Sequence, residues 1–280
     1  MGGPRAWALY SRRFRRDRPL PGERELFEAI NRSSFDATGL GRELAESRLA
    51  FALSRYDEGE RTVALLEREF PDLMARPDLV VLDLGSGNGG MLFPFAGRAR
   101  LVTLDVYIDQ ELLAFRRAAA IPLLHLVGEA SRIPLASRSV DLVMMAETLE
   151  HLAEPRRAGE EIARILTPGG VCLVSTPPRL KFALKPDPHY GIRGLALLPD
   201  ALQRFVAKRL YGHADYNVCH LYATSWGVGR QFPRGAFRPR VICPHRADWT
   251  RHLAWAYLAF ERQGPAAAGE SSRGQAQLEP

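Results

Sequence analysis

Short apolar runs recur along the middle of the chain, and helical patterns lie between most of them. Five runs rich in leucine and valine read as buried strands: 79–84, 101–106, 122–127, 140–145 and 171–175. Residues 110–119 and 155–166 carry apolar positions at helical spacing. This alternation predicts an α/β fold, Rossmann-like, with a mostly parallel sheet and helices on both faces. Residues 237–243 and 254–261 are candidates for a closing pair of strands.

The pattern changes on either side of this alternation. Residues 21–75 carry helical spacing among charged positions and predict an N-terminal helical segment. Residues 179–229 contain prolines, aromatic residues and an amphipathic stretch at 199–211, and they predict a cap inserted after the fifth strand. The domain proper therefore spans 76–263, and the small, polar residues 264–280 predict a disordered tail.

Composition and charge add a basic arm to this map. The chain has 280 residues, 46% of them hydrophobic and 25% charged, which is ordinary for a globular protein. The net charge is +6, and residues 1–20 account for +5 of it through six arginines and one aspartate. This arm is either solvated and flexible or a contact for anionic lipid or nucleic acid.

Targeting and metal signals are absent from the sequence. No stretch is long and apolar enough to span a bilayer, and the first residues lack an apolar signal core, so we expect a cytoplasmic protein. The three cysteines, Cys172, Cys219 and Cys243, form no C-x-x-C pair. We therefore expect neither a disulfide framework nor a metal site.

The glycine-rich turn after the first strand is the strongest chemical signal. It reads Asp83-Leu84-Gly85-Ser86-Gly87, and glycines at a strand-to-helix turn let backbone approach a ligand closely. Alone, this motif is weak evidence, because it could belong to an NAD-binding site or to a tight turn that binds no ligand. Asp83 favours a cationic ligand, because a carboxylate beside a pyrophosphate is repelled and one beside a sulfonium or ammonium group is attracted. Asp105 ends the second strand, where a carboxylate accepts hydrogen bonds from a ribose.

Three further motifs follow in register. They are G-E-A-S-R-I-P-L at 128–135, D-L-V-M-M-A-E-T-L-E-H-L at 141–152 and R-I-L-T-P-G-G at 164–170. With the glycine turn and Asp105, their order resembles the class I S-adenosylmethionine (SAM)-dependent methyltransferases, above all the methyltransferase type 11 branch that includes quinone-biosynthesis enzymes. The resemblance covers residues 79–178. It implies a seven-stranded sheet with the last strand antiparallel and SAM over the carboxyl ends of the first strands.

The resemblance also implies a role for individual residues. Those that border the cofactor are Asp83, Gly85, Ser86, Gly87, Asp105, Val106, Glu129, Ala130 and Glu147. The turn with Asp83 would hold the methionine part and Asp105 the ribose, while Val106 would pack on the adenine. Glu129 and Ala130 would border the adenine edge, although relatives more often have aspartate at the Glu129 position. The backbone of Glu147 would line the methionine part.

Candidates for acid–base catalysis are His151, His189 and His220. His151 either caps the helix after the fourth strand or lies near the methyl acceptor. His189 and His220, in the predicted cap, could each be a base or an ordinary loop histidine.

Together these features predict an enzyme that transfers a methyl group from SAM to an oxygen of a small-molecule or lipid- or glycan-linked acceptor. Alternatives are a nucleic-acid methyltransferase, supported only by the basic arm, a non-catalytic SAM-binding scaffold, and an NAD-dependent oxidoreductase. The apolar stripe of the cap helix, with Phe205 beside Arg204 and Lys208, either covers the cleft or lies on a membrane surface.

Overall fold

The computed structural model describes residues 22–38, 41–182, 185–186, 191–210, 212, 220–242, 252–253 and 257–264. The predicted basic arm 1–20, nearly all of the tail 264–280, and His189 lie outside these residues.

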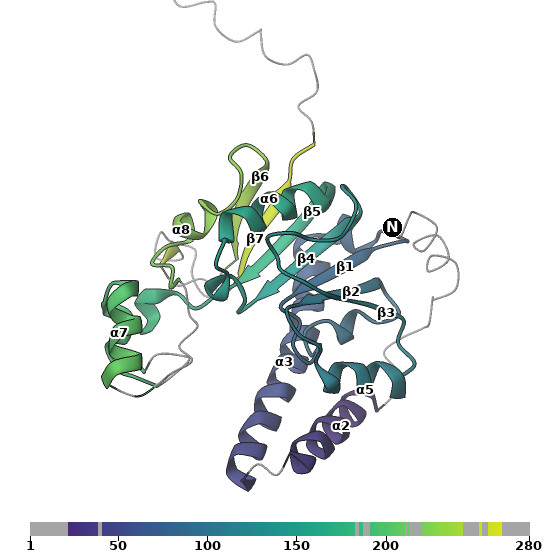
Figure 1. Cartoon of the computed structure of the whole chain (residues 1–280). Helices are drawn as coiled ribbons and strands as arrows, with labels where there is room; N and C mark the ends of the chain where they lie inside the picture. Colours follow the sequence, from purple (N-terminus) through teal and green to yellow (C-terminus); the bar gives the residue numbers. More distant parts are fainter. Residues whose placement is uncertain are drawn as a thin grey trace, which may run out of the picture.

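A single sheet of seven strands forms the centre of the molecule (Figure 1), as the resemblance implied. The strands are β1 (Val80–Leu84), β2 (Arg100–Asp105), β3 (Leu123–Val127), β4 (Val140–Ala146), β5 (Leu166–Ser175), β6 (Phe237–Ile242) and β7 (Tyr257–Arg262). Their order is β3-β2-β1-β4-β5-β7-β6, and β7 is antiparallel to both of its neighbours. The predicted Rossmann-like, mostly parallel sheet is confirmed.

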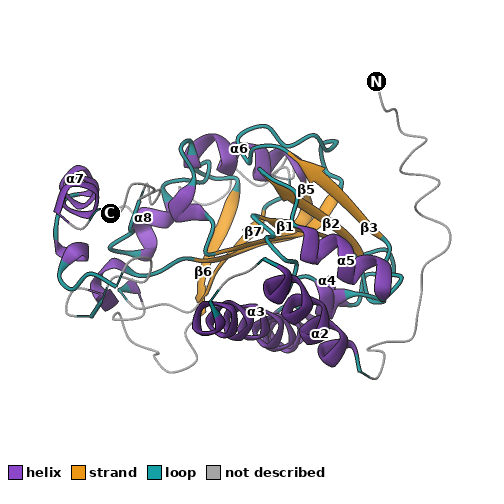
Figure 2. Cartoon of the chain, turned by 60° about the horizontal axis from the view of Figure 1, so that its bottom comes forward, coloured by secondary structure: helices purple, strands orange, loops and turns teal. Residues whose placement is uncertain are grey.

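Helices cover both faces of the sheet (Figure 2). One face carries α2 (Glu23–Ala37), α3 (Arg42–Glu69), α4 (Pro71–Met74) and α5 (Gln110–Ala118), whose apolar side chains join one buried cluster with alternate strand residues such as Val81 and Met144. The other face carries α6 (Pro155–Ile165) and α8 (Ser225–Gly229), which bury Ile162 and Val228 against residues such as Leu82 and Val143. This alternation between two clusters is the period-two pattern of strands buried on both sides.

Local sequence explains where the helices near the site begin. The Asp109 side chain accepts a hydrogen bond from the Leu112 amide at 3.0 Å and so caps the first turn of α5. The long helix α3 buries Leu49, Ala52 and Tyr56 at helical spacing and extends past the carboxyl ends of the strands. Between β1 and β2 the chain forms only a short 3₁₀ turn, η1 (Phe93–Phe95).

The segment after β5 forms a small unit with its own apolar cluster. It contains η3 (Arg179–Phe182), η4 (Leu195–Leu197) and α7 (Asp200–Leu210), and their core includes Leu195, Ala207 and Leu221. Figure 1 shows α7 to one side of the sheet, well away from α2 and α3. Among the described residues, no helix is both long and apolar enough to cross a membrane.

Candidate active site

The turn after β1 is shaped by a contact with the loop after β4. Gly85 has φ +71°, and a Cβ atom there would lie 2.4 Å from the Thr148 hydroxyl oxygen. That hydroxyl donates a hydrogen bond to the carbonyl of Leu84 at 2.9 Å. Glycine is therefore required at position 85 for both backbone conformation and space.

A cavity of about 590 Å³ opens beside this turn, and helix α3 supplies one of its walls. The turn itself contributes Asp83, Gly85, Ser86 and Gly87. The other lining residues are Phe35, Ser47, Arg48, Phe51, Ala52 and Arg55 from the N-terminal helices, Asn88, Gly90 and Met91 beyond the turn, Tyr107, Asp109 and Glu111 after β2, Ala146 at the end of β4, and Glu147 after it. The cavity thus lies at the carboxyl ends of the central strands, where ligands bind in open α/β sheets.

Asp83 is the electrostatic centre of this cavity. Its side chain is 1% exposed, and its Oδ2 atom has no hydrogen-bond partner among the described residues. Burial raises the pKa of Asp83 to about 7; Arg55 acts to lower this pKa and Asp105 to raise it further. A buried carboxylate without a full set of partners costs free energy unless a cationic ligand approaches it. The ammonium and sulfonium groups of SAM fit this requirement.

Asp105 at the end of β2 is tied to the same turn. Its Oδ2 atom accepts a hydrogen bond from the Gly87 amide at 2.9 Å, and its Oδ1 atom accepts one from the Val106 amide at 2.7 Å. Val106 and Tyr107, which follow, are 66% and 57% exposed. An anchored carboxylate beside exposed apolar side chains is an arrangement that suits a nucleoside, with polar hydroxyls and an apolar base.

Two predicted adenine-side residues lie further along the same edge. Glu129 is exposed and accepts a hydrogen bond from the Ser131 hydroxyl at 3.2 Å, whereas Ala130 is buried. Neither lines the 590 Å³ cavity, nor do Asp105 and Val106. The structure therefore gathers Asp83, Gly85, Ser86, Gly87 and Glu147 in one cavity and joins Asp105 to it through Gly87, while Glu129 and Ala130 lie apart.

Two glutamates follow β4. Glu147 has φ +56°, and its carboxylate accepts a hydrogen bond from the Ser175 hydroxyl at 2.6 Å. Glu150 is fully buried, and burial, followed by the charge of Glu147, raises its pKa to about 8. Burial therefore favours the protonated form of Glu150, which the sequence motif alone did not indicate.

Two of the three histidine candidates, His151 and His220, belong to the described residues, and neither lines the cavity. His151 ends the short helix η2 (Leu149–His151) and is partly buried, and it does not line the cavity. The His220 amide donates a hydrogen bond to the Glu150 carbonyl at 3.0 Å, and its Nδ1 atom lies 3.7 Å from Asp200 Oδ2. The described part of 179–229 therefore reaches the loop after β4 but contributes no side chain to the cavity lining.

The contribution of α3 to the cavity was missed from the sequence. Arg55 donates hydrogen bonds to Glu58 at 2.7 Å and to the Ala146 carbonyl at 3.4 Å, so it links α3 to the end of β4. Such long-range neighbours cannot be read from spacing within one segment.

Comparisons with known proteins agree with this geometry. A family model described as a methyltransferase domain matches residues 82–174. An uncharacterized methyltransferase of Mycobacterium tuberculosis is 41% identical over 90 residues, which are 32% of this chain and 36% of that protein. A protein of Mycolicibacterium smegmatis named a probable S-adenosylmethionine-dependent methyltransferase is 35% identical over 108 residues, 38% of this chain and 40% of that protein.

A third relative is a malonyl-[acyl-carrier protein] O-methyltransferase of a Marinomonas species. It is 30% identical over 141 residues, 48% of this chain and 52% of that protein. The chain thus spans about a third to a half of the length of these curated relatives. The domain match and the strand order together identify residues 82–174 as the core of a class I SAM-dependent methyltransferase domain.

Proposed function

We propose that this protein transfers a methyl group from SAM to a hydroxyl of a small-molecule or lipid- or glycan-linked acceptor. The observation that carries the proposal is the buried carboxylate of Asp83 beneath the Gly85–Gly87 turn, with one oxygen free of hydrogen bonds among the described residues. A cationic ligand would favour the ionised form of a carboxylate in such a place.

In this proposal, different residues around the cavity bind different parts of the cofactor. Asp83, with the Gly85, Ser86 and Gly87 turn, holds the methionine part, and the backbone after β4 at Glu147 closes this end. Asp105 accepts hydrogen bonds from the ribose with the lone pairs that its two backbone partners leave open.

The adenine lies at the exposed end of β2. Val106, with 66% of its surface exposed, packs on the base, and Glu129 and Ala130 border its edge from the loop after β3. Burial of Val106 by the ring adds apolar contact to a charged recognition site.

When bound, SAM supplies an activated methyl group on a positively charged sulfur. The protein's part is to align the acceptor oxygen in line with the methyl–sulfur bond and to exclude water. The acceptor's hydroxyl proton needs a base, and His220, His151 and His189 are the candidates. His220 has the strongest support, because its amide is fixed to the Glu150 carbonyl and Asp200 lies 3.7 Å from its ring.

The surface of α7 supports a lipid-linked acceptor. Leu202, Phe205 and Leu210 are 43%, 57% and 69% exposed, and Arg204, Lys208 and Arg209 lie on the same helix. An amphipathic helix of this kind binds the boundary of an anionic bilayer through both apolar burial and charge. Helix α7 would then meet the membrane that carries the acceptor.

The test is a labelling experiment with the full chain. A bacterial lysate is incubated with SAM labelled in the methyl group, and label is measured in the lipid, small-molecule and nucleic-acid fractions. We expect label in lipid or small-molecule products, and Asp83→Asn should lose it. Label confined to nucleic acid, or equal label with Asp83→Asn, would contradict the proposal.

A second measurement separates acceptor recognition from cofactor binding. His220→Ala should keep SAM affinity and lower turnover by about a hundredfold, the usual scale for loss of an acid–base group. His125→Ala, on β3 away from the cavity lining, is the matched control. Full turnover in His220→Ala would remove this residue from the chemistry and leave His151 and His189 to test.

A further inference from the structure

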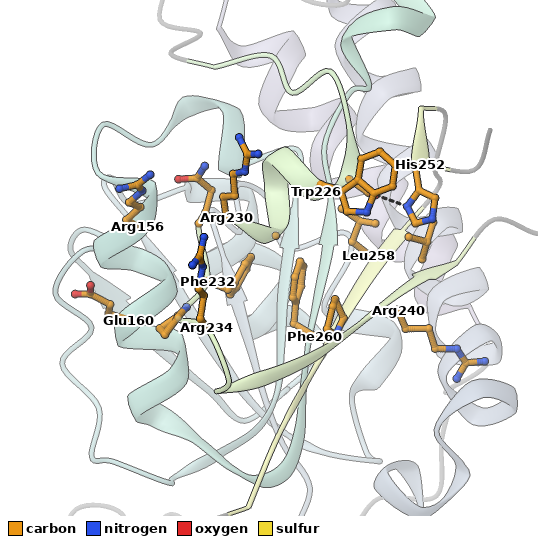
Figure 3. Close-up of a pocket in the computed structure, with 16 residues that line it drawn as sticks. Arg156, Glu160, Trp226, Arg230, Phe232, Arg234, Arg240, His252, Leu258 and Phe260 are labelled. Atoms are coloured by element: carbon orange, nitrogen blue, oxygen red, sulfur yellow. Dashed lines mark hydrogen bonds between the residues drawn. The ribbon is translucent and has the colours of Figure 1, made fainter. Parts of the chain in front are cut away.

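A second and larger cavity lies on the opposite face of the sheet from α3 (Figure 3). Its volume is about 1140 Å³, and it is bounded by α6, by α8 with the loop that follows, and by β6 and β7. It shares no lining residue with the 590 Å³ cavity that holds Asp83. A molecule in it would therefore occupy a site separate from the methyl-transfer centre.

One end of this cavity is cationic. Arg156 from α6 and Arg230 and Arg234 from the loop after α8 surround it (Figure 3), and all are exposed. None of these three arginines forms an ion pair within the described part of the chain, and Glu160 is the only acidic side chain on the lining. Arg240 does not belong to this cationic end, because its guanidinium is paired with Glu69 on α3.

The start of α6 contributes Arg156 to this cationic end. Its neighbour Arg157 is paired with the N-cap residue Glu154, with 3.0 Å between Nη1 and Oε2, so the charge of Arg157 is balanced at the helix end. The amino end of a helix carries partial positive charge of its own, which adds to the charge of Arg156.

The other end is aromatic. Phe232 and Phe260 stack at 3.9 Å between ring centroids and form the floor. Trp226 is 59% exposed and stacks on His252 at 4.6 Å with an angle of 15° between the rings, while the Ser225 hydroxyl lies 2.7 Å from His252 Nδ1. Figure 3 shows this Trp226–His252 pair across the phenylalanine floor from Arg156. A tryptophan held flat by a stacked neighbour, with its other surface open, offers a platform for a planar ring.

We propose that this cavity binds a phosphate-bearing ligand with a planar ring, the chemical class of nucleotides. One guanidinium group can donate two parallel hydrogen bonds to the oxygens of a phosphate, so the three arginines suit a ligand with phosphate groups. The tryptophan suits the base, and the cavity volume is large enough for a drug-sized molecule. Because the site is remote from Asp83, its ligand is an effector or an anchor and not the methyl acceptor.

The experiment uses the full chain and uridine diphosphate as the probe, measured by titration calorimetry with and without saturating S-adenosylhomocysteine. A uracil nucleotide avoids the adenine recognition of the cofactor site. We expect binding that S-adenosylhomocysteine does not displace, and uridine or pyrophosphate alone should bind at least about tenfold more weakly. Displacement by S-adenosylhomocysteine, or pyrophosphate that binds as tightly as the nucleotide, would overturn the proposal.

Variants place the ligand in this cavity. The double change Arg230→Gln and Arg234→Gln should weaken binding by about tenfold or more, since each charge-assisted hydrogen bond is worth at least that factor. Trp226→Ala should also weaken it, and Trp226→Phe should restore part of it. Arg238→Gln, an exposed arginine on β6 outside the cavity lining, is the control and should change affinity less than about twofold.

Two results would contradict the assignment. Equal weakening by Arg238→Gln would mean diffuse attraction between charges and no built site. Binding to phosphatidylglycerol vesicles that the Arg230 and Arg234 changes abolish, without nucleotide binding by the unchanged chain, would make this face a membrane contact. All replaced side chains are exposed, so circular dichroism and the melting temperature should match those of the unchanged chain.

Discussion

Replacement of Asp83 by asparagine should stabilise the empty protein and weaken cofactor binding at the same time. Burial raises the pKa of the Asp83 carboxyl from 3.8 to about 7. The folded chain therefore keeps a proton that the unfolded chain loses between these two pH values. Since the folded state binds more protons there, the free energy of unfolding falls as pH rises through this interval.

This difference between the unfolded and folded pKa values lowers the free energy of unfolding of the parent protein by about 4 kcal/mol between pH 4 and pH 8. Asparagine carries no charge and avoids this loss, but a buried amide without partners costs about 1–3 kcal/mol. The variant should therefore be more stable than the parent by about 1–3 kcal/mol at pH 8 and have no such advantage at pH 4. Urea unfolding of the cofactor-free proteins at both pH values measures this difference.

Cofactor binding should respond in the opposite direction. A cationic ligand lowers the pKa of Asp83, so binding releases a proton, and affinity for SAM in the parent should rise by up to about tenfold per pH unit from pH 5 to pH 7. The asparagine variant should bind about ten to a hundred times more weakly at pH 8, because it loses a charged hydrogen bond. An unchanged affinity, or an identical pH slope in both proteins, would refute the placement of Asp83 against the cofactor.

Further expectations follow from other parts of the chain. Asp105→Ala should weaken SAM binding by about ten to a hundredfold in calorimetry, because it removes a charged acceptor of ribose hydrogen bonds; unchanged affinity would remove Asp105 from the site. Deletion of residues 1–20 should leave SAM affinity intact, since no described lining residue of the cofactor cavity precedes Phe35, and a loss of affinity would show that the arm belongs to the site. Gly159→Ala should lower stability by about 1–3 kcal/mol in urea unfolding, because its Cβ would lie 2.1 Å from the Gln231 carbonyl oxygen.

The strands of the sheet could be predicted because their apolar runs are continuous. Runs at 79–84 and 140–145 correspond to β1 and β4, and the run at 237–243 corresponds to β6. The start of β5 was harder to predict. The strand begins at Leu166 and not at Val171, and it includes Thr167 to Gly170, where the pairing register with β4 shifts. Proline and two glycines suggest a loop, and the stretch is indeed irregular, because the register with β4 shifts across it and Gly169 has φ +70°.

Part of the cofactor site could also be predicted, because some of its residues form one local motif. Asp83, Gly85 and Gly87 lie close together in sequence, and their turn follows a strand that was easy to recognise. The wall formed by α3 was not accessible, because Arg48 and Arg55 read as ordinary solvent-facing charges of an amphipathic helix. Their role in the site depends on contacts between segments far apart in sequence, such as that of Arg55 with Ala146, which are 91 residues apart.

The position of β7 in the sheet bears on how this chain acquires its structure. β6 precedes β7 in the sequence, yet among the described residues β7 is the one strand that pairs with β6, since β7 lies between β5 and β6. Until residues 257–262 are in place, β5 presents an unpaired edge and β6 has no sheet to join. Unpaired strand edges recruit one another between molecules. Until this strand inserts, the edge of β5 and the whole of β6 are therefore open to pairing with another molecule.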